Sequence, residues 1–518
     1  MKHSMLHDLI AMLLLLLLGG YYLTYREVFS ALPYEDAAIL MRYIDHLANG
    51  HGIVWNIGEP PIDGGTDFLF LILAAFIQKS GLSTESAVLF LNLIGYFATP
   101  MIVFLCWKRM GNKSWLSFII ASLTLLGPAY AYIEAGFATP FFGFLTALCS
   151  FFCLLYVDKP NGRFGASAFG ISALLLALCR PEGVFLSAFL VLGVVVYLGR
   201  KKSIQLVKSY AVWVIAVGSI YLIWHYVYFG HLLPNPFYKK GGGVLYWGSL
   251  IEAGKNVSFL LHPLALTFFA LLYVRVGVKQ RSLILLLIPI VGFSLIWVLL
   301  SNEMNYMMRF QFAVFPLAAT LSAYLIGNLP ENTFGSLKGR ILAAIILFIS
   351  VIHYLGYFPS EAKLKDGRFE VAKLLNEYTN EGYSIALSEA GLLPFYSGWR
   401  CLDSWGLNDH RIALDGVIAG TYLANFQPDL IMYDAYEESG ITNINPIWAS
   451  YGDMIDTLDD FIEKEEFELI AKYSSPLKDH AHYYFINPRI PDAAEIKDKI
   501  RTSNYFWYEY GRVVEPEF

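Results

Sequence analysis

Residues 9 to 23 read LIAMLLLLLLGGYYL, an apolar run that begins a few residues after Lys2 and His3. Apolar runs of roughly 17 to 25 residues, each long enough to cross about 30 Å of hydrocarbon as a helix, recur along the chain as far as residue 357. Of all residues, 56% are hydrophobic and only 15% are charged, a composition typical of proteins that the bilayer solvates. The sequence therefore predicts a multi-pass membrane protein.

The first apolar run also resembles a signal peptide. No small-x-small cleavage site follows it cleanly, so we predict that it remains as an uncleaved membrane anchor. We place about eleven transmembrane helices, near residues 9–25, 85–107, 114–131, 138–157, 165–180, 183–199, 207–229, 256–274, 282–300, 310–327 and 341–357. The apolar stretch 68–77 is too short to span the membrane and is predicted to be an interfacial or re-entrant helix.

The charges of the loops predict an orientation. On one side lie the N-terminus and the loops near residues 108–113, 158–163, 200–208, 275–281 and 329–340. Together these carry 15 Lys and Arg against three acids, which is typical of a cytoplasmic face. The first loop on the other side, residues 26–67, holds seven acids and two arginines. An odd number of helices also places the C-terminal domain outside, so we expect an inner-membrane protein with extracytoplasmic chemistry.

The chain divides by composition into residues 1–358, the predicted transmembrane domain, and residues 359–518, which are rich in Asp and Glu and numerous enough to bury a core of their own. Strand and helix patterns alternate in the second part, with strands near residues 384–388, 430–433, 467–473 and 482–486 and helices near 367–378 and 447–464. The predicted fold class is a membrane all-α domain followed by an extracytoplasmic α/β domain. Of five cysteines only Cys401 lies in the second part, and no disulfide framework or zinc motif is implied.

Polar residues gather in the loops of the predicted outer face. The first loop contains YED at 34–36, NGHG at 49–52 and DGGT at 63–66. Later loops contain EAGFATP at 134–140, RPEG at 180–183, HLLPNPFYKK at 231–240 and NEMNYMMRF at 302–310. The C-terminal part contains SEAGLLPFY at 388–396 and LDSWGLND at 402–409.

These motifs resemble those of the GT-C fold glycosyltransferases, membrane enzymes that use polyprenyl-phosphate sugars. More narrowly they resemble the branch that contains the mycobacterial terminal arabinofuranosyltransferases, which carries an acidic pair, an N-G-x-G turn, a G-x-T stretch and an L-P-N-x-x-Y-x-K stretch. The resemblance spans nearly the whole chain, and it implies the GT-C fold with about eleven transmembrane helices. At 306–309 the sequence YMMR matches the family's arginine element more loosely, which leaves the register of Arg309 open.

The resemblance implies a catalytic role for the acidic pair Glu35 and Asp36. Glycosyl transfer to a hydroxyl needs a carboxylate that takes the acceptor's proton while the sugar–phosphate bond breaks through an oxocarbenium-like state. Asp36 is expected to be this base, and Glu35 to orient it or to bind a divalent cation. The alternative is that both acids merely cap the helix that runs through Arg42 to His46.

Other residues are expected to surround this pair. For the donor phosphate the resemblance implies Lys239 or its neighbour Lys240, together with Arg309, Asn235 and Tyr238. The alternative is that these bases rest on lipid headgroups. As supporting residues we name Glu134, Arg180, Glu182 and His51. Arg180 and Glu182 are equally open to interpretation as a structural ion pair.

The sequence thus predicts an inverting glycosyltransferase that moves one sugar from a polyprenyl-phosphate donor, held in membrane lipid, to a hydroxyl of an envelope polysaccharide or glycolipid. No cofactor is certain, a divalent cation is left open, and no nucleic-acid partner is expected. The alternatives are a transporter or flippase of lipid-linked saccharides, for which charges at mid-membrane in paired halves are expected, and a scaffold protein with vestigial carboxylates. Tyr396, Trp399 and Trp405 could stack on acceptor sugars, although such aromatics are more often core.

Overall fold

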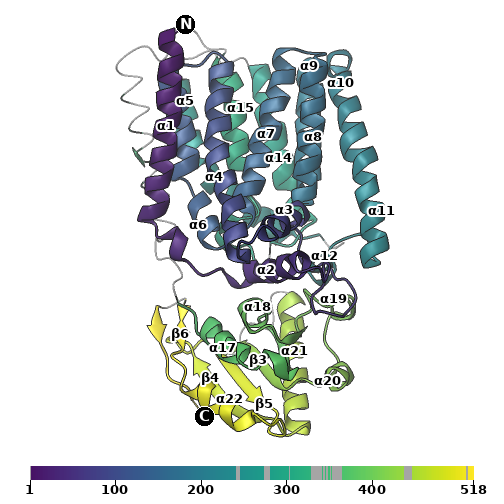
Figure 1. Cartoon of the computed structure of the whole chain (residues 1–518). Coiled ribbons are helices and arrows are strands. Elements are labelled where there is room, and N and C mark those ends of the chain that lie inside the picture. Colours follow the sequence, from purple (N-terminus) through teal and green to yellow (C-terminus); the bar gives the residue numbers. More distant parts are fainter. Residues whose placement is uncertain are drawn as a thin grey trace.

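The computed structural model of the chain has two parts (Figure 1). It describes residues 2–240, 245–273, 280–302, 304–327, 365–436, 446–508 and 511–517, with positions 341, 345, 348, 349 and 352. A bundle of roughly parallel helices forms the first part, and a layered α/β domain covers one end of it. The N-terminus lies at the opposite end of the bundle, so the two faces that the loop charges distinguish are also separate in space.

The helices of the bundle follow the apolar runs. They are α1 (Lys2–Tyr25), α4 (Thr84–Arg109), α5 (Ser114–Leu126), α6 (Ala129–Glu134), α7 (Thr139–Asp158), α8 (Arg163–Cys179), α9 (Glu182–Leu198), α10 (Arg200–Tyr210), α11 (Gly218–Phe229), α13 (Trp247–Tyr273), α14 (Ile284–Leu295) and α15 (Val314–Gly327). Every predicted transmembrane segment before residue 328 is helical over most of its length. The predicted helix at 341–357 lies mostly outside the described residues.

Length and composition identify the strongest candidate spans. Within the part of the chain that the structure describes, five helices are long and apolar enough to cross a membrane: Met5–Tyr25, Thr84–Arg109, Ser114–Glu134, Thr139–Asp158 and Arg200–Phe229. The last runs from α10 to α11 through a π-helical segment, Ala211–Val217. The shorter apolar helices pack among them, as α9 does against α14.

Small residues and side-chain hydrogen bonds hold the bundle together. A Cβ atom on Gly95 of α4 would lie 2.6 Å from the backbone of Pro140 at the start of α7, so only glycine permits this close packing. The indole N–H of Trp107 on α4 donates to the carbonyl of Ala319 on α15 at 2.7 Å. Hydrocarbon offers no hydrogen-bond partner for polar groups. Hydrogen bonds of this kind therefore satisfy the polar groups that are buried inside the bundle.

Three short helices lie between the bundle and the α/β domain: α2 (Glu35–Ala48), α3 (Phe68–Gln78) and α12 (Asn235–Lys239) (Figure 1). With 11 residues, α3 is the short helix that the sequence predicts at 68–77. Its last residue, Gln78, donates to the Asp45 carboxylate of α2 at 2.7 Å, which ties the two helices together.

The α/β domain contains a five-stranded sheet in the order β2-β1-β3-β5-β4. The strands are β1 (Ser384–Leu387), β2 (Arg400–Asp403), β3 (Leu430–Tyr436), β4 (Glu468–Ser474) and β5 (His480–Ile486), with a separate pair β6 (Phe506–Trp507) and β7 (Arg512–Val513). The helices are α17 (Gly367–Asn376), α18 (Leu392–Ser397), α19 (His410–Asp415), α20 (Gly420–Phe426), α21 (Pro446–Lys464) and α22 (Ala493–Arg501). β1 pairs in parallel with β2 and β3, and the other pairs are antiparallel.

Four of these strands and two of the helices lie where the sequence predicts them, whereas α18, α19, α20, α22, β2, β6 and β7 are additional elements. The segment around Gly391 and Pro394, expected to be a turn, begins α18, because a proline is tolerated in the first turn of a helix. Strand β2 was not predicted, since it begins with a charged Arg and ends with a charged Asp. The predicted domain boundary between residues 358 and 359 lies outside the described residues.

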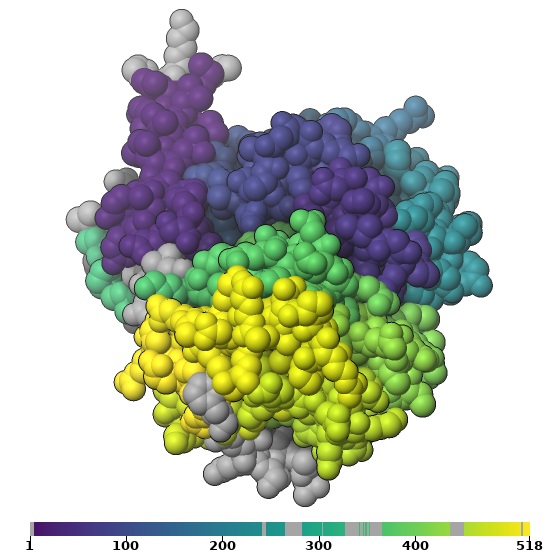
Figure 2. Space-filling model, turned by 60° about the horizontal axis from the view of Figure 1, so that its bottom comes forward, coloured from purple at the N-terminus to yellow at the C-terminus, as the bar shows by residue number. Residues whose placement is uncertain are grey.

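Helix α2 joins the two parts through one buried arginine. Arg42 donates from Nε to the Trp55 carbonyl at 2.8 Å, and from its terminal nitrogens to the carbonyls of Pro394 and Trp399, the latter at 2.9 Å. Figure 2 shows the result: the green region that contains α17 and α18 lies between the yellow strands and the helical bundle. The loop of residues 26–67 is therefore held between the bundle and the α/β domain.

Candidate active site

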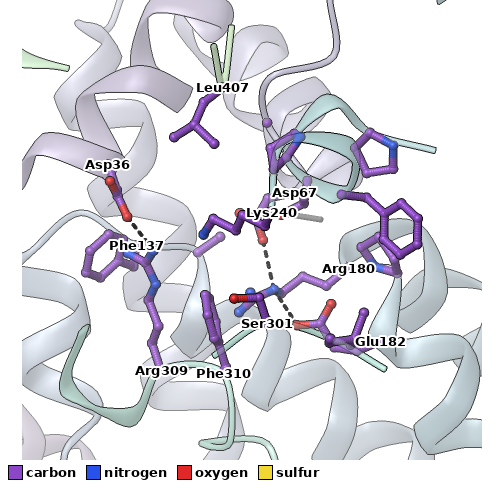
Figure 3. A pocket seen from close by; sticks show the side chains of 18 of the residues that line it. Asp36, Asp67, Phe137, Arg180, Glu182, Lys240, Ser301, Arg309, Phe310 and Leu407 are labelled. Atoms are coloured by element: carbon purple, nitrogen blue, oxygen red, sulfur yellow. Dashed lines mark hydrogen bonds and ion pairs between the residues drawn. The ribbon is translucent and has the colours of Figure 1, made fainter. Parts of the chain in front are cut away.

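A cavity of about 530 Å³ lies at the end of the bundle, beside α2 and α12. Its apolar wall includes Leu233, Phe237, Ile296, Trp297 and Leu300. Its polar wall includes Asp36, Asp67, Arg180, Glu182, Lys240 and Arg309 (Figure 3). Leu407 closes one side from the α/β domain. The cavity is thus amphiphilic, with charges on one side and hydrocarbon on the other.

Three cationic side chains meet at one aromatic ring in this cavity. The guanidinium carbons of Arg309 and Arg180 lie 5.1 and 5.5 Å from the centre of the Phe310 ring, and the Lys240 ammonium lies 5.9 Å from it. The three cations come from segments far apart in the sequence: the α8–α9 turn, the end of α12 and the loop before α15. Each is attracted to the ring face, which holds together charges that otherwise repel one another.

Asp36 and Arg309 form the ion pair on one side of the ring (Figure 3). Asp36 is the second residue of α2, and its Oδ2 lies 2.5 Å from Arg309 Nη2. The other terminal nitrogen of Arg309, Nη1, is buried and makes no hydrogen bond to the described residues. The pair therefore offers a free buried donor beside a carboxylate whose side chain is 31% exposed.

A strained loop places Arg309. Met304, Met307 and Met308 have φ angles of 58°, 51° and 60°, in the left-handed region that non-glycine residues seldom adopt. The Met307 carbonyl accepts a hydrogen bond from the Tyr132 hydroxyl at 2.6 Å, and the Asn305 side chain accepts one from the Phe310 backbone at 3.0 Å. Such strain is retained where the surroundings enforce it, often at functional sites.

Arg180 forms a second charged corner with Asp67 and Glu182. Its Nε lies 3.0 Å from Glu182 Oε1 and 3.3 Å from Asp67 Oδ1. Arg180 and Glu182 are buried, and they line the cavity as the sequence analysis allowed. Asp67 was not predicted. The available signal was its place at the end of the acidic first loop, directly before the apolar helix α3.

Glu35 points away from the cavity. Its Oε1 accepts hydrogen bonds from the backbone N–H groups of Gly391 at 2.5 Å and Leu392 at 3.0 Å, at the start of α18. Its other oxygen lies 3.6 Å from Arg368. Glu35 therefore joins α2 to the α/β domain.

Lys239 and Asn235 also serve this contact between the two parts, which corrects their expected place at the phosphate. The Lys239 ammonium donates to the Gly416 carbonyl at 2.5 Å and lies 4.0 Å from the centre of a Trp405 ring. Burial lowers the pKa of Lys239 to about 8. The Asn235 side chain donates to the Leu407 carbonyl at 3.1 Å. Since successive helical residues point about 100° apart, only one of the two lysines faces the cavity, and that one is Lys240.

The remaining predicted residues lie outside the cavity wall. Tyr238 stands edge-on to His410, with ring centres 5.8 Å apart. Glu134 is buried at the end of α6, within electrostatic range of Tyr508. His51 is exposed, with its ring edge-on to His46. The structure thus brings Asp36, Arg309, Arg180 and Glu182 together, and leaves these three apart from them.

The aromatic residues of the α/β domain are mostly core. Trp399 and Trp405 are 2% and 3% exposed, so neither is available to stack on a sugar. The Trp399 indole donates to the Leu375 carbonyl at 2.8 Å, as a structural residue does. Tyr396 is half-buried and packs edge-on against Phe369.

Among the described residues there is no group of three or more His, Cys, Asp or Glu side chains placed to hold a metal ion. Glu35, which the sequence left open as a cation ligand, binds backbone N–H groups instead.

Comparison with known proteins identifies the fold. Residues 357–487 match a family described as a domain of unknown function, DUF8728, and no curated protein sequence matches the chain. The structure of ArnT from Cupriavidus metallidurans in the apo state superposes with a TM-score of 0.57, at 11% identity, over 91% of this chain and 98% of ArnT. ArnT bound to undecaprenyl phosphate gives 0.55, at 12% identity, over 90% and 97%.

The fold is the GT-C fold. The coarse predicted class is confirmed: the chain has several apolar helices followed by a C-terminal α/β region, and the superposition on ArnT covers 91% of it. The archaeal oligosaccharyltransferase AglB from Archaeoglobus fulgidus, in complex with an inhibitory peptide and a dolichol-phosphate, gives a TM-score of 0.49, at 12% identity, over 93% of this chain and 75% of AglB. The count of eleven helices, the orientation and the resemblance to arabinofuranosyltransferases stay predictions.

Proposed function

We propose that this GT-C protein is an inverting glycosyltransferase. It moves a single sugar from a polyprenyl-phosphate donor to a hydroxyl of an envelope polysaccharide or glycolipid on the outer side of the membrane. The observation that carries the proposal is the amphiphilic cavity, in which Arg309 and Lys240 lie at the Phe310 ring beside one partly exposed carboxylate, Asp36. The relative ArnT has been seen with undecaprenyl phosphate, a lipid of the same chemical class as the proposed donor's carrier.

The cavity suits both ends of such a lipid. Its apolar wall, with Leu233, Phe237 and Trp297, accepts isoprene units. On the polar side, Arg309 and Lys240 bind the phosphate, Arg309 through the buried Nη1 that has no partner in the described part of the chain. When the sugar leaves, the phosphate gains a negative charge, and fixed cations stabilise that charge more strongly in a low-dielectric cavity than in water.

Asp36 is the proposed general base. Its Oδ2 is held by Arg309, and its Oδ1 makes no hydrogen bond to the described residues. In the proposed step the acceptor oxygen attacks the anomeric carbon from the face opposite the phosphate, the bond from that carbon to the phosphate oxygen breaks, and the acceptor's proton passes to Asp36. Attack from the opposite face inverts the configuration at that carbon.

The test is the Asp36→Asn variant, which keeps the volume of the side chain and removes the base. We expect turnover to fall by roughly 10²- to 10⁴-fold, as for loss of a general base. In cells the lipid-linked donor should accumulate while the envelope glycan loses one type of residue. The matched control is Asp45→Asn, on the same helix but outside the cavity, where the carboxylate accepts from Gln78. A wild-type glycan profile in the Asp36→Asn cells would contradict the proposal and favour the transporter.

A further inference from the structure

The corner formed by Asp67, Arg180 and Glu182 is not used in the proposed step. It lines the same cavity as Asp36 and Arg309 but lies on the other side of Phe310 and Lys240 (Figure 3). Asp67 comes from the first external loop, and the other two residues from the turn between α8 and α9. The cavity therefore has a second polar region besides the one proposed for the phosphate and the base.

The polar atoms of this corner have unused hydrogen-bonding capacity. Asp67 Oδ1, Glu182 Oε1 and Arg180 Nε are buried, yet none makes a hydrogen bond to the described residues, because the ion pairs between them lack hydrogen-bond geometry. Arg180 and Glu182 are 6% and 7% exposed. Buried polar atoms that are paired by charge but make no hydrogen bond still cost free energy, so such a corner can accept a bound polar molecule.

The charge of the corner indicates what it binds. Two carboxylates face one guanidinium, so the corner repels a phosphate and offers mainly hydrogen-bond acceptors. Sugar hydroxyl groups are donors that carboxylates accept well, while the guanidinium can donate to a hydroxyl or ring oxygen. Arg309, whose ion pair in the described part of the chain is with the single carboxylate of Asp36, and Lys240 are left for the phosphate.

We infer that Asp67, Arg180 and Glu182 form the subsite for the sugar of the lipid-linked donor. This inference rests on the proposed function and deepens it: the donor carries a neutral sugar with free hydroxyl groups toward the α8–α9 turn. A site that hydrogen-bonds substrate hydroxyls discriminates against analogues that lack them, because its own buried groups are then unpaired. The three residues thus determine specificity for the sugar, and not affinity for the lipid phosphate.

The experiment compares two kinds of probe on the purified full-length protein. Dissociation constants are measured for undecaprenyl phosphate alone, and for undecaprenyl phosphate that carries glucose, mannose or arabinose. In wild-type protein we expect one sugar-bearing probe to bind more tightly than the bare lipid. In the double variant Asp67→Asn, Glu182→Gln this preference should shrink by about 10- to 100-fold, the range for charged hydrogen bonds, while the affinity for bare undecaprenyl phosphate stays unchanged.

A matched control is Asp63→Asn, four residues earlier in the same loop. The Asp63 carboxylate lies 2.7 Å from His225 and does not line the cavity, so its variant should keep the sugar preference. Thermal unfolding of each variant shows whether it is folded, and the single variant Asp67→Asn, which leaves the Arg180–Glu182 pair intact, replaces the double variant if that one unfolds.

Two results would overturn the inference. One is an unchanged sugar preference in the folded variant, or no sugar preference in wild type. The other is a clear change of affinity for bare undecaprenyl phosphate in the variant: a rise would show that Arg180, freed from its two acids, serves the phosphate. If wild-type protein binds neither bare nor sugar-bearing lipid, the proposed function itself fails.

Discussion

Neighbouring residues in this protein have different partners. Asp36 faces the cavity, whereas Glu35, one residue before it, binds the start of α18. Lys240 faces the cavity, whereas Lys239 binds the Gly416 carbonyl. Adjacent helical positions point about 100° apart. Of two neighbouring residues with the same charge, one therefore faces the cavity and the other contacts the α/β domain.

The two lysines provide a first prediction. Lys240→Ala should weaken binding of undecaprenyl phosphate by about 10- to 100-fold, because a hydrogen bond to a charged group is lost. Lys239→Ala should leave that affinity unchanged but lower the free energy of unfolding by about 1 to 3 kcal/mol, because the partly buried Gly416 carbonyl loses its donor. Binding to labelled undecaprenyl phosphate and thermal unfolding separate the two effects. Equal loss of affinity in both variants would contradict this assignment.

At the scale of elements, loops that follow the parallel strands face α2. The residues after β1 include Gly391, and those after β2 include Leu407, which reaches the cavity. Carboxyl ends of neighbouring parallel strands lie at one edge of a sheet, which explains why motifs some 15 residues apart act together there. The antiparallel strands β4 and β5 lie on the far side of β3.

The close contact between α18 and α2 leads to the second prediction. A Cβ atom at Gly391 would lie 2.0 Å from the Glu35 carbonyl oxygen, so Gly391→Ala should push the two elements apart and cost about 1 to 3 kcal/mol or more. Gly420→Ala, at the start of α20, meets nothing within 4 Å and is the control. Thermal unfolding and protease resistance of the purified protein measure the difference. Equal stability of both variants would show that this contact does not hold the domain.

Strand β5 carries a histidine that predicts acid sensitivity. Burial lowers the pKa of His482 from 6.5 to about 3, and its Nδ1 lies 2.7 Å from the Tyr505 hydroxyl. Between pH 6.5 and 3 the unfolded chain binds a proton at this residue that the folded chain does not, so stability should fall as the pH falls through this window.

The measurement is the pH dependence of the unfolding free energy in wild type and in His482→Gln. The wild-type slope should exceed the slope of the variant by up to about 1.4 kcal/mol per pH unit, the value for one proton. Parallel slopes would mean that His482 is already protonated in the folded domain, and the prediction would then be wrong.

For the whole molecule, the contact between the bundle and the α/β domain is part of the site. The cavity needs Leu407 from the domain, and Asn56 of the first loop holds the domain in place. The Asn56 side chain accepts from the Cys401 backbone N–H and donates to the Cys401 carbonyl, both at 2.9 Å. These two hydrogen bonds connect the edge strand β2 to the first loop. Movement of the α/β domain away from the bundle would therefore break them first.

Cys401 allows this contact to be followed. It is 1% exposed and is the only cysteine of the C-terminal part. Asn56→Ala should raise the rate at which a water-soluble maleimide labels Cys401. The same variant should also lower turnover. Asn49→Ala, in the same loop but with a side chain that donates to the Asp45 carboxylate, should leave the labelling rate unchanged. Faster labelling without loss of turnover would show that the cavity works without the docked domain.

The sequence by itself determined that the protein has an apolar helical part followed by an α/β part. Apolar runs, loop charges and the change of composition near residue 359 are local properties, and transfer from water to hydrocarbon depends on local composition. Motif resemblance also singled out Asp36, Arg309, Arg180 and Glu182, which the fold brings to one cavity.

Only the tertiary structure decided which side chains share the cavity. It brought Arg309, Arg180 and Lys240 to the ring of Phe310, added Asp67, and turned Glu35 and Lys239 toward the α/β domain. It also paired the short strand β2 with β1. The reason is physical: the direction of a side chain and the partner of a strand depend on contacts between residues far apart in the chain, which neither periodicity nor composition records.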